Sequence, residues 1–344
     1  MATVAVDANG ADLGPREVAE GAMLAARGGV RVIVYGDASR MGEVSGDVTV
    51  VDAPVSIAKA ADPASAARST PEASIVQAAR AVADGQADAL VSAGSTGAAL
   101  AAGLFNVKRA SGIYRPALAV PVPIPGAPVT LVDVGANADV RAEHLVQFAF
   151  MGAALVTLRQ GIARPRVALL SNGEEPTRGN GLVIEAHGLL AERTAGSTAL
   201  EFVGNVEGTQ VTTGAADVIV ADGFTGNIAL KMLEGTSQTL LGAIRDRAMA
   251  SSRGKLGGIL LRPALRGLRD ELDPEGPGGA YLLGLRKLGV VPHGRFTRRG
   301  FANAIAVAAR GVDEDLVGRT IAAMEAAGAL RRPPSDRTAT VAAE

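Results

Sequence analysis

The chain contains no cysteine among its 344 residues. Disulfides, thiolate catalysis and cysteine-ligated metal clusters are therefore excluded, and a reducing cytoplasm is the expected compartment. Tryptophan is also absent and aromatic residues make up only 3%, so the core has to be built from alanine, valine, leucine and isoleucine. Such a core suits parallel strands that are covered on both faces by alanine-rich helices.

Long hydrophobic runs without a breaker are missing as well. The most apolar stretch, residues 117–134, carries prolines at positions 121, 123, 125 and 128 and cannot form a membrane-spanning helix. We therefore expect a protein that is soluble or that lies at most on a membrane surface. The net charge of −1 shows no excess of one sign, which argues against a general nucleic-acid binder.

Several motifs of well-known active sites do not occur. The sequence has no Walker A loop, no strand followed by G-x-G-x-x-G and no G-x-S-x-G, which disfavours the common nucleotide loops and a serine-hydrolase elbow. Its three histidines, His144, His187 and His293, are far apart and lack H-E-x-x-H spacing. We therefore predict no metal site.

What the sequence does contain is one arrangement that occurs seven times: a short apolar run, a polar glycine-rich break, and then a helical pattern. Each fits a buried parallel strand whose carboxyl end leads into a loop and a crossover helix. We therefore predict an α/β fold with a mostly parallel sheet. The runs with their breaks cover residues 4–10, 32–37, 89–97, 131–137, 167–175, 202–208 and 218–227.

Polar side chains stand at the end of each of these predicted strands. Because the carboxyl ends of parallel strands in an open sheet lie along one edge, we expect these side chains to share a polar site. The alternative is that each is an ordinary cap or turn residue. The set comprises Asp7, Asn9, Ser92, Ser95, Asp133, Asn137, Asn172, Glu174, Asn205, Glu207, Asp222 and Asn227.

Two of the predicted helices open with small and hydroxyl-bearing residues. The exposed N–H groups and the positive end of the helix dipole make such a start an anion site, most simply for phosphate. Ordinary N-capping is the alternative. The two starts comprise Gly94, Ser95, Thr96 and Gly97, and Gly223, Thr225, Gly226 and Asn227.

Cations stand near the same strand ends. Arg178 lies in a loop between breakers, Lys231 follows the second helix start by one turn, and His293 precedes a cluster of arginines at 295, 298 and 299. Most exposed arginine and lysine side chains are solvated, so the alternative for each of these residues is a surface side chain with no role in a site.

Residues 250–278 begin and end in breakers and contain a predicted amphipathic helix. Leucines at 261, 265, 268 and 272 form an apolar stripe, and arginines at 262, 266 and 269 line the neighbouring face. The helix either packs on the body or contacts anionic lipid or an acidic protein. Residues 329–344 are polar and rich in proline, arginine and alanine, which predicts a disordered tail.

Eight segments resemble, in order and spacing, the acyl-ACP:phosphate acyltransferase family over about residues 4 to 310. The stretches 131–152 and 217–235 are the most specific. The segments read VDANGADLGP, SAGSTGA, DVGANADVRAEHLVQFAFMG, NGEEPTRGN, GNVEG, DGFTGNIALKMLEG, GGAYLLG and HG.

The resemblance implies that a fatty acyl group moves from the thioester of acyl carrier protein to inorganic phosphate, giving acyl phosphate for bacterial phospholipid synthesis. It implies a Rossmann-like three-layer α/β/α fold, related to isocitrate and isopropylmalate dehydrogenases, in one domain over residues 1–328. It also implies a homodimer that works without metal or cofactor and that touches the inner face of the cell membrane through a helical hairpin at 250–278.

The resemblance and the strand-end pattern together define a candidate site. We predict that Arg178, Lys231, His293 and Asn227 are catalytic, with the two cations on the phosphate or oxyanion and His293 protonating the departing sulfur. The candidates for binding phosphate and substrate are Asp7, Gly94, Ser95, Thr96, Gly97, Asp133, Asn137, Asn180, Asp222, Gly223, Thr225 and Gly226.

Four positions depart from the pattern of the family. Ala8–Gly10 stands in place of Met-Gly-Gly, Ser95 in place of Asn, Arg178 in place of Lys, and Arg295–Phe296 in place of two serines. The second and third changes preserve hydrogen bonding and charge, whereas the last changes the loop after His293. Three other functions stay open: a phosphotransacetylase that uses acetyl-CoA, a decarboxylating dehydrogenase that needs a metal and NAD(P), and a non-catalytic membrane scaffold for acyl carrier protein.

Overall fold

The computed structural model describes residues 1–271, 273 and 275–331. An eleven-stranded mixed sheet forms its centre, in the order β3-β2-β1-β4-β11-β10-β5-β6-β9-β7-β8. The strands are β1 Thr3–Asp7, β2 Arg31–Gly36, β3 Val48–Asp52, β4 Ala89–Ser92, β5 Ala117–Val122, β6 Val129–Val132, β7 Arg166–Leu170, β8 Glu201–Val206, β9 Val218–Val220, β10 Ala280–Leu283 and β11 Gly289–Val291.

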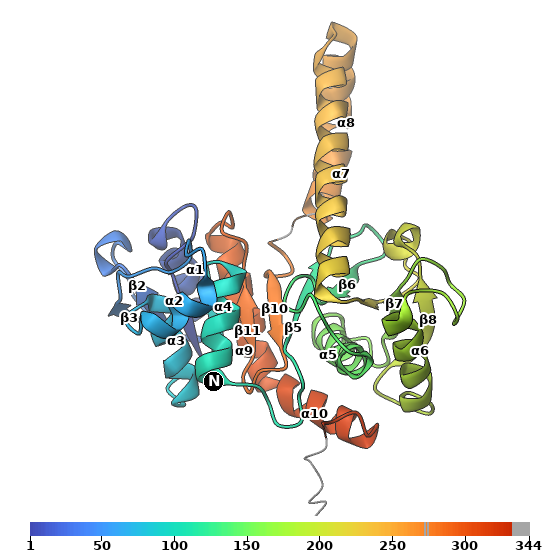
Figure 1. Ribbon diagram of the computed structural model, residues 1–344. Coiled ribbons are helices and arrows are strands. Elements are labelled where there is room, and N and C mark those ends of the chain that lie inside the picture. The colour runs from blue at the N-terminus through green and yellow to red at the C-terminus, as the bar shows by residue number, and fades with distance from the viewer. Residues whose placement is uncertain (272, 274, 332–344) are drawn as a thin grey trace, which may run out of the picture.

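Helices cover both faces of this sheet (Figure 1). Alternate residues of a strand point to opposite faces, and in β1 the side chains of Val4 and Val6 join one buried cluster while Ala5 joins the other. The helices are α1 Pro15–Arg27, α2 Pro63–Ser69, α3 Ser74–Ala83, α4 Thr96–Ala102 with a π-helical continuation Gly103–Val107, α5 Ala142–Gln160, α6 Gly181–Arg193, α7 Gly223–Met249, α8 Ser252–Glu271, α9 Arg298–Asp313 and α10 Leu316–Ala326.

The sheet consists of two parallel blocks that run in opposite directions. Strands β3, β2, β1, β4 and β11 are mutually parallel, and so are β6, β9, β7 and β8. Between the blocks, three antiparallel pairings through β10 and β5 reverse the direction. The carboxyl ends of the two blocks therefore lie at opposite edges of the ladder, and the prediction of a single polar edge is wrong.

Sheet twist brings these two edges back toward one side of the molecule. Six steps in the strand order separate β1 from β9, and at about 20–25° per step the direction turns by about 120–150°. The paired helices α7 and α8 join the two blocks, because α7 begins directly after β9 and the chain returns from α8 to β10, beside β11. Figure 1 shows both helices projecting far from the sheet.

All seven predicted strands are confirmed, as is the α/β class with a mostly parallel sheet. The helix predicted to open at Gly223–Asn227 is α7, which begins at Gly223 with Asp222 as its N-cap. Of the predicted tail, residues 332–344 lie outside the described residues, whereas the backbone of Ala329 accepts a hydrogen bond from Gln147 Nε2 at 2.9 Å. Within the described residues, none of the helices combines the length and the apolar character needed to cross a bilayer.

Candidate functional site

Asp7 is buried at the end of β1, where its carboxylate organises the loops around it. It accepts hydrogen bonds from Ser74 Oγ at 2.6 Å and Ser92 Oγ at 2.8 Å. Ser92 Oγ in turn accepts the backbone N–H of Gly94 at 3.2 Å. Burial raises the pKa of Asp7 to about 6, although these hydrogen bonds act to lower it. The geometry makes Asp7 a positioning residue for the loop that opens α4.

The helix start at Gly94–Gly97 is linked to Asp7 through the hydroxyl of Ser92. Ser95 is the N-cap of α4 and its Oγ accepts the N–H of Ala98 at 3.3 Å. His293 follows β11, the neighbour of β4, and is exposed. We call Asp7, Gly94–Gly97 and His293 the β1–β4–β11 group.

His293 has a defined hydrogen-bond geometry. Its Nδ1 accepts the backbone N–H of Arg295 at 3.2 Å. In a neutral imidazole whose Nδ1 accepts, the proton resides on Nε2, so the exposed nitrogen can donate. Phe296, one of the two departures from the family pattern in this loop, is buried with its ring 6.3 Å from that of His293.

Asp133 and Asn137 form a tight loop after β6. The Asp133 carboxylate accepts the N–H groups of Ala136 at 2.8 Å and Asn137 at 3.1 Å, and also Asn137 Nδ2 at 2.8 Å. Asn137 Nδ2 donates a second hydrogen bond to the carbonyl of Pro116 at 2.7 Å. Burial raises the pKa of Asp133. Because these polar atoms bond within the protein, they shape the loop.

The start of α7 packs directly on this loop. The N–H of Gly223 donates to the carbonyl of Asn137 at 2.8 Å. A Cβ at Gly226 would lie 2.1 Å from the carbonyl oxygen of Asp133, so only glycine permits this contact between backbones. We call Asp133, Asn137, Gly223, Gly226 and the exposed Asn227 the β6–β9 group.

A cavity of about 330 Å³ lies beside the β6–β9 group, at the ends of β7 and β9. Three predicted site residues line it: Asn180, Asp222 and Thr225. Asn180 caps α6 by accepting the N–H of Val183 at 3.0 Å, and Asp222 caps α7 by accepting Thr225 N at 2.8 Å. The first turns of two helices thus open at one cavity, and their dipoles favour an anion there.

The predicted cations flank this region without lining the cavity. Arg178 lies in the loop before Asn180 and pairs with Glu175 at 3.6 Å. Lys231 pairs with Glu234 at 2.7 Å and lies four residues after Asn227, on the same face of α7. All four paired side chains are exposed, so both pairs are weak and can yield to a substrate anion.

The structure therefore does not bring all the predicted site residues together. The β1–β4–β11 group, the β6–β9 group and the cavity rim are three clusters, and in the described part of the chain no side-chain hydrogen bond joins one cluster to another. Ser171, which follows β7, was missed by sequence reasoning. Its Oγ is buried without a hydrogen-bond partner among the described residues, and it lines the cavity. The sequence signal that could have identified Ser171 was its position at the end of a predicted strand.

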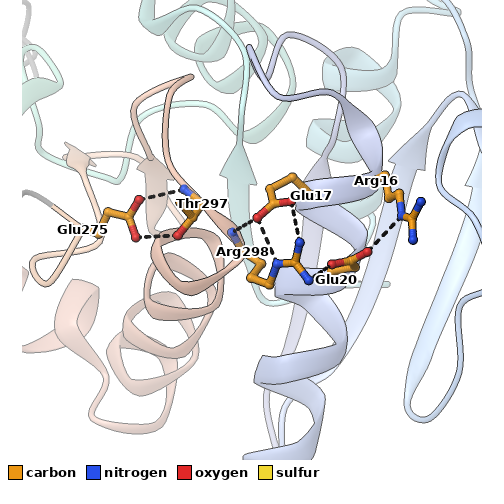
Figure 2. Close-up of polar contacts among 6 residues, drawn as sticks. All are labelled: Arg16, Glu17, Glu20, Glu275, Thr297 and Arg298. Atoms are coloured by element: carbon orange, nitrogen blue, oxygen red, sulfur yellow. Dashed lines mark hydrogen bonds and ion pairs between the residues drawn. The ribbon is translucent and has the colours of Figure 1, made fainter.

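The return from α8 is fastened to α9, which follows the His293 loop (Figure 2). Glu275 accepts Thr297 N and Thr297 Oγ1, each at 2.7 Å. Arg298 at the start of α9 pairs with Glu17 and Glu20 of α1. Since α7 starts in the β6–β9 group, the paired helices connect the two polar groups.

The sequence has close relatives along almost its whole length. The family described as "Fatty acid synthesis protein" matches residues 2–319. The phosphate acyltransferase of Moorella thermoacetica is 43% identical over 321 residues, which cover 91% of this chain and 93% of that protein. That of Streptococcus equi subsp. zooepidemicus is 40% identical, with 93% and 97% covered. That of Myxococcus xanthus is 46% identical over 60% of this chain and 61% of its own.

Solved structures share the fold at much lower identity. EutD phosphotransacetylase from Staphylococcus aureus aligns with a TM-score of 0.60 at 17% identity, covering 90% of this chain and 94% of that one. A phosphotransacetylase from Streptococcus pyogenes aligns with a TM-score of 0.59 at 18% identity, covering 91% and 94%. At these identities the likeness shows a shared α/β fold.

Proposed function

This chain belongs to the fatty acid synthesis protein family, and from that membership we propose that it is a phosphate acyltransferase of phospholipid synthesis. In this reaction an oxygen of inorganic phosphate attacks the thioester carbonyl of acyl-acyl carrier protein. The C–S bond breaks, acyl phosphate forms, and the carrier's thiol leaves as a thiolate or takes a proton. The observation that carries the proposal is the 43% identity to a phosphate acyltransferase over 91% of the chain.

The chemistry requires little beyond positioning and charge. Phosphate is already an anion at neutral pH, and the thiol, with a pKa of about 8.5, is a fair leaving group. The enzyme must hold the anion near the carbonyl and stabilise the oxyanion that develops. None of these tasks requires a metal ion.

Two helix starts at one cavity support a phosphate site at its rim. Asn180 and Asp222 fix the first turns of α6 and α7 there. We assign Arg178 to the phosphate or the oxyanion, because it lies two residues before Asn180. We assign Lys231 and Asn227, which share a face of α7, to the same phosphate or oxyanion. His293, whose Nε2 can donate, protonates the departing sulfur in this proposal.

The paired helices support the further proposals of membrane contact and dimerisation. Large exposed apolar surfaces mark interaction sites, and α7 and α8 carry many exposed apolar side chains. We propose that this helical hairpin touches the inner face of the cell membrane in a cytoplasmic homodimer. The exposed residues are Phe224, Ile228, Met232, Leu240, Leu241, Ile244, Met249, Leu256, Ile259, Leu260 and Leu261. Of the predicted stripe, Leu272 and the side chains of Leu265 and Leu268 lie outside the described residues.

One continuous sheet supports a single domain. Its eleven strands run from Thr3 to Val291, α9 packs on β1, β4 and β11, and α10 packs on α5 and α9. We propose one acyltransferase domain over residues 1–328 with the Rossmann-like three-layer architecture of isocitrate and isopropylmalate dehydrogenases.

The test is incubation with acyl-acyl carrier protein and phosphate, with acyl phosphate trapped by hydroxylamine. A parallel reaction with acyl-CoA separates a carrier-dependent enzyme from a phosphotransacetylase. No acyl phosphate from either donor would overturn the function.

The residue roles need variants. Arg178→Ala, Lys231→Ala and His293→Ala should each lower kcat/KM by roughly tenfold or more, the effect of losing one charge or proton donor in the transition state. Arg178→Lys keeps the charge and should retain most activity. Wild-type rates in all three alanine variants would contradict the assignments while leaving the reaction itself intact.

A further inference from the structure

Six exposed cations lie on adjoining segments around the loop that leads into β5. None of the ion pairs within the described residues involves any of them. We call this set the basic patch. It comprises Lys108, Arg109, Arg115, Arg141, Arg286 and Arg331.

Backbone contacts hold the segments of the basic patch together. The segment at Arg109 pairs antiparallel with the turn between β10 and β11, and the N–H of Arg286 donates to the carbonyl of Lys108 at 3.0 Å. Lys108 and Arg286 therefore stand opposite each other across this pairing, where like charges are destabilising. The N–H of Arg331 donates to the carbonyl of Gly112 at 2.8 Å, which adds a fourth segment beside the loop.

The other members of the patch surround Tyr114. Arg109 donates a hydrogen bond to the carbonyl of Tyr114, and the guanidinium of Arg141 lies 5.9 Å from the centre of the Tyr114 ring. Burial lowers the pKa of His144, and the positive charges of Arg141 and Arg115 lower it further, so both cations are close to the same imidazole. The six side chains thus form one continuous surface.

Few carboxylates are available to neutralise the patch. Residues 89–132 and 276–312 contain no aspartate or glutamate, although the whole chain has 35 acidic residues against 34 basic ones. Arg141 is the one member with acidic residues close in sequence, Asp139 and Glu143. A surface with one sign of charge attracts a partner of the opposite sign and accelerates its association.

The basic patch borders the β6–β9 group. Asn137 Nδ2 donates to the carbonyl of Pro116 at 2.7 Å, and Pro116 directly follows Arg115, while Arg141 lies four residues after Asn137. Figure 1 shows α10 and the teal segment that enters β5 at the end of the molecule away from the tip of α7 and α8. A membrane at that tip would therefore leave the patch free for a protein partner.

We infer that the basic patch docks an acidic face of the acyl carrier protein and so presents the acyl thioester to the β6–β9 group. The inference rests on the proposed function, and it names the surface that recognises the donor. The patch spans four segments, which is more than a phosphate ion can contact, and it lies beside the site that the thioester has to reach. Complementary charge of this kind sets the association rate and the orientation of a partner.

The experiment compares two donors of the same acyl group, acyl-acyl carrier protein and acyl-pantetheine, in phosphate-dependent turnover. Lys108→Glu/Arg286→Glu should raise KM for the carrier-bound donor by about tenfold or more and change kcat little, because the charges act on association. KM for acyl-pantetheine should stay unchanged, since this donor has no protein to dock. Arg27→Glu, which reverses an exposed charge on α1 outside the patch, should leave both values unchanged. If charge reversal unfolds the protein, Lys108→Gln/Arg286→Gln provides the same comparison and also relieves the repulsion.

Binding provides a readout apart from turnover. In calorimetry the carrier protein should bind the double variant more weakly than the wild type, and salt should weaken its binding to the wild type. Vesicles of anionic phospholipid should bind both proteins equally. Loss of vesicle binding in the double variant, with KM for the carrier-bound donor unchanged, would assign the patch to lipid and overturn the inference. Acyl phosphate formation with an unchanged KM in both Lys108/Arg286 double variants would overturn the inference alone. No acyl phosphate from either donor would overturn the proposed function and this inference with it.

Discussion

Asp7 allows a quantitative prediction, because its buried carboxyl has a pKa of about 6 in the native state against 3.8 for a fully solvated aspartate. Between these values the native state binds more protons than the unfolded chain, so the free energy of unfolding falls as the pH rises. The difference of about 2.2 units corresponds to about 3 kcal/mol. This loss is absent below the lower pKa and complete above the higher one.

Replacing Asp7 with asparagine removes the titration and keeps the shape of the side chain. The amide can accept from one of the serine hydroxyls that now donate to Asp7 and donate to the other. The free energy of unfolding of Asp7→Asn minus that of the wild type should therefore rise by about 3 kcal/mol between about pH 3 and pH 7. Other titrating groups cancel in this difference.

Urea unfolding of both proteins across this pH range measures the difference directly. A flat difference for Asp7→Asn would refute the reasoning, since it would mean that Asp7 ionises over the same pH range in the native protein as in the unfolded chain.

Two further predictions concern packing and capping. Gly226→Ala should destabilise the protein by several kcal/mol and abolish activity, since the new Cβ would meet the Asp133 carbonyl at 2.1 Å; Gly188→Ala on α6, with no atom within 4 Å of its Cβ, should stabilise by about 0.5–1 kcal/mol. Thermal unfolding compares the two, and equal effects would contradict the packing argument. Glu275→Ala removes both hydrogen bonds to Thr297 and should cost about 1 kcal/mol, whereas an unchanged urea midpoint would show that the cap contributes nothing.

Strands in the sequence were predictable where a run of apolar residues ended on a polar glycine-rich break. All seven such strands are present. The four strands that were not predicted, β3, β5, β10 and β11, lack either an uninterrupted apolar run or the glycine-rich break with a helix after it. β3 is followed by no glycine-rich break, β10 leads to β11 with no helix between them, and β5 contains Pro121. Pro121 pairs with Thr130 of β6 beyond the last residue of β5 that pairs with β10, so one side of the strand is locally an edge, where proline is tolerated.

The candidate site was predictable as a set of positions but not as an arrangement. Residues such as Asn180 and Asp222 do cap helices at a common cavity. Their separation from Asp7 follows from the reversal of strand direction through β10 and β5, and no local pattern encodes a direction. Ser171 shows the remaining gap: its missing hydrogen-bond partner is a property of packing around the side chain, which sequence alone does not display.

The close contact of Gly226 with the Asp133 carbonyl has a mechanical consequence. With 27 residues, α7 is about 40 Å long at 1.5 Å per residue, and backbone contacts hold its first turn. The helix therefore acts as a rigid arm that is held at its first turn. A tilt of 5° at this turn would move the far end of the helix by about 3.5 Å over that length. Conversely, a force applied at the far end of α7 produces its largest torque at the first turn of the helix. That turn lies next to the cavity lined by Asp222 and Thr225.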